Sequence, residues 1–135
     1  MMGCDIYCYR EERDGIGVWR HVGGESFHGD PAEFEVDRNY WVFGSLGYNY
    51  TLDDIEAIAE SRGLPADVSD EVAGQCVDQG RYGRSGDFGH HHSWVTLAEL
   101  NAHDFDGAST FQGAIDRLRE STKHPDDVRL VFWFD

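Results

Sequence analysis

The chain has 135 residues, of which 11 are basic and 26 acidic, so its formal net charge is −15. This length suits one domain with a single modest core, and the charge argues against electrostatic binding to nucleic acid or to an anionic membrane. The longest apolar runs are far too short to span a bilayer, and the first residues lack the basic and apolar regions of a secretory signal. We therefore expect a soluble, cytoplasmic protein that binds neither nucleic acid nor membrane.

The composition of the charge is more informative than its sum. Ten basic residues are Arg and only Lys123 is Lys, while sixteen acidic residues are Asp and ten are Glu. This bias favours a halophile-like adaptation, because net charge aids solubility where salt screens self-repulsion. High-GC coding also favours Arg over Lys. An acidic surface that imitates DNA is the functional alternative, but the longest acidic runs are only pairs. We interpret the charge as a solvated surface.

The three cysteines do not predict a disulfide framework. Cys4 and Cys8 would share one face of a strand about 13 Å apart, which is too far to bridge. We expect both to be small core residues. A metal site that also uses Cys76 lacks the support of a CxxC spacing.

The first half of the chain begins with a predicted hairpin. Residues 3–10 and 16–22 alternate as strands do, and Asp-Gly at 14–15 supplies the turn. Residues 23–36 are expected to be a loop, and residues 37–50 fit a short helix as well as a strand or turn. Thr51 is a candidate cap for a helix that ends at Gly63.

Residues 66–90 are predicted to be a long loop with at most a turn of helix at 69–76. A capping box at 96–99 then predicts a short helix that ends near His103. A second box at 109–112 opens another helix, which His124–Pro125 ends.

The closing strand covers residues 128–134 and is expected to pair with the first strand. The order of elements predicts an α+β fold, with a small, mainly antiparallel sheet made of the N-terminal hairpin and the C-terminal strand. About three helices would pack on this sheet. Because no repeat or linker is visible, residues 1–135 are interpreted as a single domain.

Strand alternation divides these strands into two faces. The apolar face is the predicted core and contains Cys4, Ile6, Cys8, Ile16, Val18, Val128, Leu130, Phe132 and Phe134. The other face contains Asp5, Tyr7, Tyr9, Trp19, His21, Arg129 and Trp133. Aromatic rings beside an acid, an imidazole and a guanidinium resemble a ligand platform. The alternative is a half-covered amphipathic face with Asp5 paired to Arg129.

Two polar clusters complete the candidate sites. His90 and His92 would share a face of an extended strand and, with Asp5, Asp87 or Cys4, bind Zn²⁺ for hydrolysis. No HExxH or CxxC supports this site, so we expect no cofactor and keep zinc as the alternative. The segment DRNY supplies Arg38, Asn39 and Tyr40, which suit a polar or anionic ligand, although Asp37 could equally cap a helix there.

Several segments resemble a family of small uncharacterised proteins found in bacteriophages, prophages and some bacterial and archaeal genomes. They are MGCDI at 2–6, DRNY at 37–40, RGLPADVS at 62–69, HSWVTLAEL at 92–100 and VRLVFWFD at 128–135. Members of the family typically begin with Met-Gly-Cys-Asp-Ile-His, whereas this chain has Tyr7 at the position of that His. The departure weakens a metal site built on Asp5. The resemblance implies a viral accessory protein in a host cytoplasm, and it implies no activity.

We therefore expect a non-catalytic protein that holds a polar or anionic small molecule, such as a signalling nucleotide. The expected ligand-binding residues are Asp5, Tyr7, Arg38, Asn39, Tyr40, His92, Trp94, Arg129 and Trp133. One alternative is a metal-dependent hydrolase that uses His90, His92 and Asp5. Another is an inhibitor that binds a basic host protein through the acidic surface. Small binding proteins often place sites between subunits, which leaves a homo-oligomer open.

Overall fold

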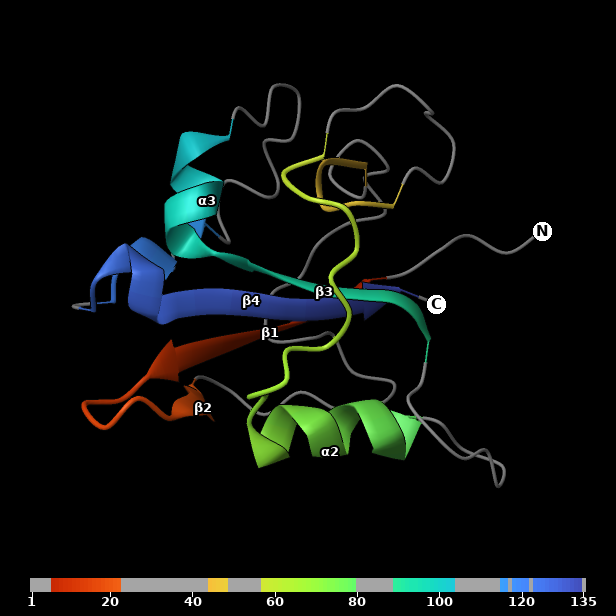
Figure 1. The fold of residues 1–135 in the computed structure, drawn as a ribbon, viewed down its shortest axis with the longest axis horizontal. Coiled ribbons are helices and arrows are strands. Elements are labelled where there is room, and N and C mark those ends of the chain that lie inside the picture. The colour runs from red at the N-terminus through yellow and green to blue at the C-terminus, as the bar shows by residue number, and fades with distance from the viewer. Residues whose placement is uncertain are drawn as a thin grey trace.

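The centre of the molecule is a four-stranded antiparallel sheet with the strand order β2-β1-β4-β3 (Figure 1). The computed structural model describes residues 6–22, 44–48, 57–79, 89–103, 115–116, 118–121 and 123–134. The strands are β1 (Ile6–Arg13), β2 (Trp19–His21), β3 (His90–Thr96) and β4 (Val128–Phe134). The helical elements are α2 (Asp70–Gln79), α3 (Leu97–Ala102) and the 3₁₀ turn η1 (Pro125–Asp127). This arrangement agrees with the α+β prediction, although the described ranges delimit two α-helices where about three were expected.

The first and last strands pair with each other, as predicted. β1 and β4 run antiparallel from Ile6 opposite Phe134 to Glu12 opposite Val128. β4 is buried along its whole length because it has a strand on each side and a packed layer on each face. The two ends of the chain therefore form the middle of the sheet.

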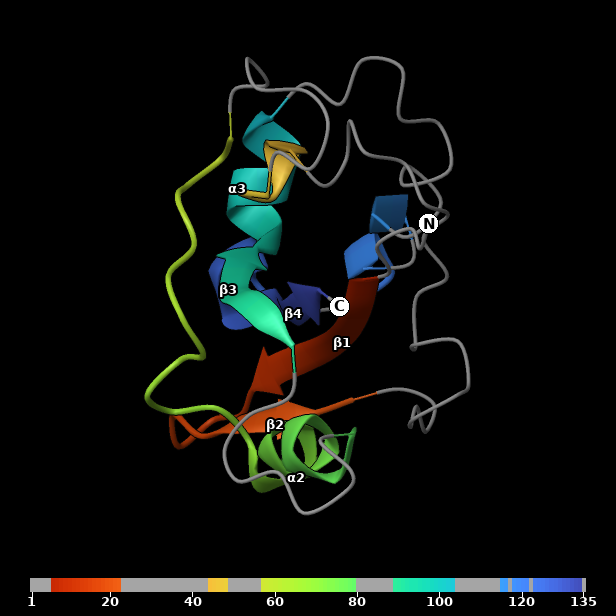
Figure 2. The same cartoon turned by 90° about the vertical axis from the view of Figure 1, so that its right-hand side faces the viewer.

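Each face of the sheet has its own hydrophobic cluster, because alternate residues of β4 point in opposite directions. The first cluster joins Phe132 to Leu100 of α3. The second joins Trp133 to Val72 and Cys76 of α2. The two helices accordingly lie on opposite sides of the sheet (Figures 1 and 2). The face that resembled a ligand platform is thus a second core.

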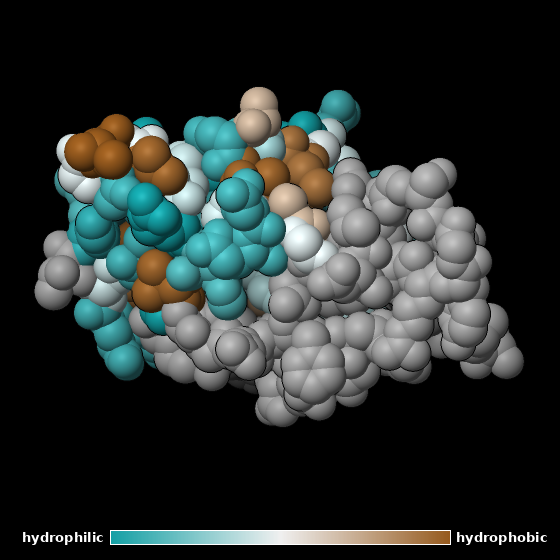
Figure 3. Space-filling model, turned by 90° about the horizontal axis from the view of Figure 1, so that it is seen from below, coloured by the Kyte–Doolittle hydropathy of each residue, from teal (hydrophilic) through white to brown (hydrophobic). Residues whose placement is uncertain are grey.

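The predicted apolar face is correct for Cys8 and for its four members on β4, which all belong to the first cluster and are Val128, Leu130, Phe132 and Phe134. It is wrong for Ile16 and Val18, which are 82% and 43% exposed. β2 begins only at Trp19, so both residues lie in the hairpin turn, where the Asp14 carboxylate accepts their backbone N–H groups at 3.0 Å. Seen from below in Figure 3, apolar side chains gather at the left end, where this turn lies in Figure 1.

Two helix predictions in the middle of the chain need correction. Residues 57–62 are not helical but form bends and irregular backbone, while residues 51–56 of that predicted helix lie outside the described residues. In the predicted loop, α2 is a complete helix instead of a single turn. Ser69 begins it by accepting the N–H of Val72 at 3.2 Å. Val72 and Cys76, one turn apart, bury the same side of α2.

The helix predicted from the capping box at 96–99 is confirmed as α3. The Thr96 hydroxyl accepts the N–H of Glu99, and the Glu99 carboxylate accepts the N–H of Thr96. Of the helix predicted after residue 109, the described residues 115, 116, 118 and 119 are helical. Of the ambiguous stretch 37–50, residues 44 and 45 are helical and residues 46 and 47 form a turn, in which the N–H of Gly47 donates to the carbonyl of Gly44.

A buried ion network joins the second cluster to the start of α2. Arg129 on β4 is 2% exposed and donates from Nε to Glu11 at 2.7 Å and from Nη1 to Asp67 at 2.9 Å. Its guanidinium lies 3.9 Å from the ring centroid of Trp19. The second oxygen of Glu11 accepts the backbone N–H of Ser69 at 2.7 Å. The expected partner Asp5 lies outside the described residues.

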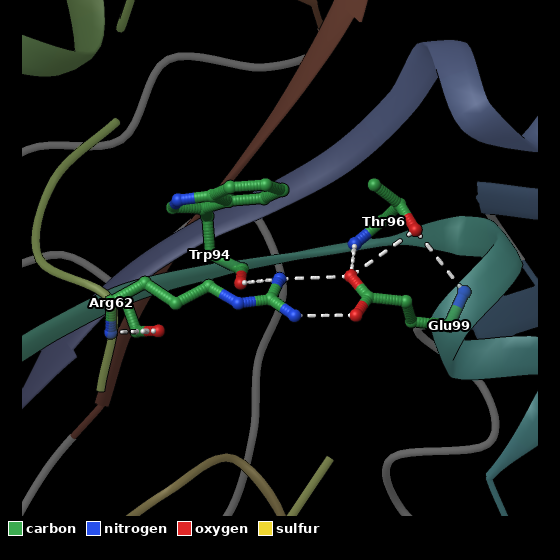
Figure 4. A network of polar contacts seen from close by, with 5 residues as sticks. Arg62, Trp94, Thr96 and Glu99 are labelled. Carbon is green, nitrogen blue, oxygen red and sulfur yellow. Dashed lines mark hydrogen bonds and ion pairs between the residues drawn. The ribbon is translucent and has the colours of Figure 1, made fainter. Parts of the chain in front are cut away.

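A second arginine fastens the segment before α2 to β3 and α3 (Figure 4). The Arg62 guanidinium donates to both carboxylate oxygens of Glu99, at 2.9 and 2.5 Å, and to the carbonyl of Trp94 at 2.9 Å. It also lies 4.5 Å from the ring centroid of Trp94. The backbone follows the same path, because the N–H of Arg62 donates to the Ser93 hydroxyl and that of Gly63 donates to the carbonyl of His92.

We predict that Arg129→Met destabilises the protein by about 3–5 kcal/mol, because it leaves Glu11 buried without its cation. Asp67→Asn removes a partner whose side chain is 64% exposed and should cost about 1 kcal/mol or less. The double variant Glu11→Gln/Arg129→Met should recover part of the loss. Urea denaturation measures all three variants, and equal losses for Arg129→Met and Asp67→Asn would contradict the network.

We also predict a pH-dependent contribution from the ion pair of Arg62 with Glu99. The hydrogen bond from Arg62 lowers the pKa of Glu99, so this stability is present above the ordinary glutamate pKa of about 4.3 and is lost as the pH falls through the folded-state pKa. Glu99→Gln keeps the capping box and removes the charge. Its stability should therefore fall below wild type by up to about 1 kcal/mol at pH 7 and approach it at pH 3. Urea denaturation across this range tests the trend, with Glu71→Gln, exposed on α2, as the control.

Candidate functional site

β3 begins with a bulge that contains the run of three histidines. His90 lies opposite Phe134 and Ser93 opposite Phe132, so β3 contains one residue more than β4 over this interval. His91 has a φ of +53°, in the left-handed region that non-glycine residues seldom adopt. Gly89 has a φ of +80°, and a Cβ atom there would lie 2.5 Å from the carbonyl oxygen of Phe134. The bulge therefore requires glycine at position 89.

The bulge changes which histidines lie together. The rings of His90 and His91 both pack on Tyr48, with centroid distances of 4.9 and 4.4 Å, and their Nδ1 atoms are 2.8 Å apart. Tyr48 also contacts Phe134 of the first cluster. The ring of His92 is 6.0 Å from Trp133, on the opposite face of the sheet. The expectation that His90 and His92 share a face is thus wrong, because it assumed a regular strand.

His91 borders an open hollow of about 640 Å³. The described residues that line it are Gly47, Ala57, Glu60, Ser61 and His91. They come from three separate segments of the chain. Gly47 allows two of these segments to approach closely, because a Cβ there would lie 3.0 Å from the carbonyl oxygen of Ala59. The hydrogen bonds of Arg62 and Gly63 to β3 hold the third segment beside them.

The groups at this hollow are polar and differ in hydrogen-bonding character. Burial, followed by the charges of the neighbouring His90 and His92, lowers the pKa of His91. Its imidazole is therefore neutral at neutral pH and offers one donor and one acceptor nitrogen. Glu60 adds a carboxyl group and Ser61 a hydroxyl that both donates and accepts. Together they can orient a small molecule with several polar groups.

The described members of the predicted ligand site do lie near one another, but mostly inside the second core. The ring of Tyr7 stacks on Trp133 at 6.5 Å, and Arg129 lies 5.7 Å from the ring of Trp94. Trp133 has no exposed surface, and Arg129 is engaged by Glu11 and Asp67. Tyr7, His92 and Trp94 are half-buried. The other predicted members, Asp5, Arg38, Asn39 and Tyr40, lie outside the described residues.

Sequence reasoning missed Gly47, Tyr48, Glu60, Ser61 and His91. The one local signal was Gly89, because an isolated glycine at the start of a strand pattern indicates a bulge. Nothing in the local sequence places residues 60–61 beside residue 91.

The structure bears on the metal and membrane predictions only within the described ranges. There, no group of three His, Cys, Asp or Glu side chains is arranged to hold a metal ion. Cys8 belongs to the first cluster and Cys76 to the second, so the sheet separates them. No helix in the described part of the chain is long and apolar enough to cross a membrane.

We predict that Gly89→Ala destabilises the protein by about 2–4 kcal/mol, because it adds a clash with Phe134 to the strain of a positive φ. Gly63→Ala is the matched control, since Gly63 has a φ of +79° and a Cβ atom there would meet no other atom within 4 Å. It should cost about 1 kcal/mol. Thermal or urea denaturation compares the two variants, and equal losses would show that the contact with Phe134 does not matter.

Comparisons with protein-family models, with curated proteins and with solved structures found no match to the chain.

Proposed function

We propose that the protein is a non-catalytic binding protein that holds a small polar molecule in the hollow beside β3. The recognition groups are the Glu60 carboxyl, the Ser61 hydroxyl and the His91 imidazole, all of which line that hollow. This retains the sequence-based hypothesis of ligand binding but moves the site away from Arg129 and Trp133, whose side chains are buried.

The observation that carries the proposal is the left-handed conformation of His91. A non-glycine residue in this region costs of the order of 1 kcal/mol, and such residues cluster at functional sites. β-Bulges likewise redirect side chains next to binding and active sites. Here the bulge places the His91 imidazole at a hollow that Glu60 and Ser61 also line. A regular strand would avoid the positive φ values of both Gly89 and His91.

The chemistry of the described lining favours a neutral or cationic ligand over an anionic one. Glu60 repels anions, and the His91 imidazole is neutral at neutral pH because its pKa is lowered. The formal charge of −15 also disfavours the approach of anions at low salt. A nucleoside or a polyol fits these groups better than a signalling nucleotide does. The resemblance to small phage proteins supports an accessory role and does not identify the ligand.

The test is a thermal-shift screen with three panels, namely neutral nucleosides and polyols, small amines, and nucleotides, followed by calorimetry of any hit. We expect saturable binding from the first two panels, with a stabilisation of about 2.7 kcal/mol at a ligand concentration of 100 times Kd. Glu60→Gln and Ser61→Ala should each weaken binding about tenfold or more, since the first replaces a charged carboxylate with a neutral amide and the second removes the hydroxyl. Glu120→Gln, an exposed glutamate distant in sequence, should bind as wild type does.

Two outcomes would contradict the proposal. If no member of the panels binds saturably, the hollow is not a small-molecule site. If a ligand binds but Glu60→Gln and Ser61→Ala leave its affinity unchanged, the site lies elsewhere. Nucleotides binding more tightly than their parent nucleosides would contradict the ligand class.

A further inference from the structure

Two adjacent histidines at the bulge face each other through their ring nitrogens. The Nδ1 atoms of His90 and His91 are 2.8 Å apart and the ring centroids are 5.0 Å apart, which is the geometry of a direct hydrogen bond. Both rings pack on Tyr48, which holds them in this position. A regular strand would place neighbouring side chains on opposite faces, so the contact depends on the bulge.

The contact between the two rings has room for one proton only. In the neutral pair, the Nδ1 of one ring carries a proton and donates it to the bare Nδ1 of the other. A first added proton can bind the bare Nε2 of the donating ring, which keeps the hydrogen bond and makes it charge-assisted. A second added proton would place protons on both Nδ1 atoms and positive charges on two touching rings. The pair therefore favours one added proton and resists the next.

The surroundings of the pair agree with this preference. Burial, followed by the charges of the neighbouring His90 and His92, lowers the pKa of His91, as expected of a ring that resists a second proton. Tyr48 adds a phenol that is uncharged at neutral and acidic pH. Glu60 lines the same hollow as His91, and its carboxylate favours a single positive charge at that border.

We propose that His90 is a positioning residue of the hollow beside β3, and that the His90–His91 pair takes up one proton as a unit when the pH falls below neutrality. The positive charge then lies at the border of the hollow, which His91 lines. It weakens the binding of cationic ligands and has little effect on neutral ones. This inference rests on the proposed function, because it describes how acid changes the ligand preference of that site.

The first test follows the imidazole NMR signals of the ligand-free protein between pH 4.5 and pH 8.5. In the wild type, the pair should titrate in two steps that are separated by more than about one pH unit. His90→Gln and His91→Asn should each leave a single step for the remaining ring, at a lower pH than the first step of the wild type. Asn tolerates the left-handed conformation, so His91→Asn preserves the bulge.

His103, at the end of α3, is the internal reference and should titrate alike in all three proteins. The inference is wrong if the wild-type titration of the pair equals the sum of the two variant titrations. It is also wrong if the first wild-type step does not lie above the single step of either variant.

The second test measures binding of choline and of uridine by calorimetry at pH 7.5 and pH 5.5, a range in which neither probe changes its charge and which lies above ordinary carboxylate titration. The wild type should lose affinity for choline roughly fourfold on acidification, as expected for a unit charge about 5 Å away in water, and should keep its affinity for uridine. His90→Gln should lose most of this pH dependence. His92→Gln is the matched control on the opposite face of the sheet and should retain it.

The outcomes separate this inference from the proposed function. Equal affinity for choline at both pH values would overturn the inference and leave the proposed function standing. If no member of the ligand panels binds, the regulation falls together with the proposed function. The titration of the ligand-free protein still decides whether the two histidines act as one proton-binding unit.

Discussion

The burial of one positive charge, the guanidinium of Arg129, determines how β1, β2 and α2 fit against β4. Arg129 has almost no exposed surface, and a buried guanidinium must find charged partners close by because its desolvation is costly. Glu11 meets this need from the position directly opposite on β1. Trp19 covers the guanidinium from β2. A single-residue slip between β1 and β4 would separate the pair, so the charge also specifies the register of the two central strands.

The Glu11 carboxylate also determines where α2 begins. One oxygen of Glu11 binds Arg129 and the other accepts the N–H of Ser69, the residue whose hydroxyl caps α2. The helix then lays Val72 and Cys76 over Trp133 and Tyr9. From the sequence alone, a strand face with one guanidinium and several aromatic rings resembles a binding surface. In the folded chain it is an interior, because the carboxylate that neutralises the arginine also recruits the helix that covers it.

The parts of the fold that could be predicted depend on local signals. The alternation of β1 and β4 and the capping box of α3 are properties of a few consecutive residues, and they appear in the structure as expected. Only one turn of α2 was expected because Gly74 and its polar residues give it a weak pattern, and its stability depends on Ser69 meeting Glu11 across 58 positions in sequence. Ile16 and Val18 match the strand period, but the Asp14 side chain binds their N–H groups and lengthens the turn.

The candidate site was harder to predict for two physical reasons. Period-two alternation holds only in a regular strand, so one inserted residue moved His91 to the side of His90 and away from His92. Glu60 and Ser61 lie beside His91 because the next residue, Arg62, donates hydrogen bonds to Trp94 and Glu99, more than thirty positions further along the chain. No local pattern encodes such a contact. Gly89 alone signalled that the histidine run would not be a simple strand.

The hydrogen bonds from Arg62 and Gly63 to β3 affect whether another protein can pair with this strand. β3 is a terminal strand of the sheet, and an open terminal strand offers free backbone groups to any extended peptide. The carbonyl of His92 is already occupied by Gly63, and that of Trp94 by Arg62. The chain thus covers this part of the border with its own backbone and an arginine, so an added strand could use these two carbonyls only by displacing residues 62 and 63.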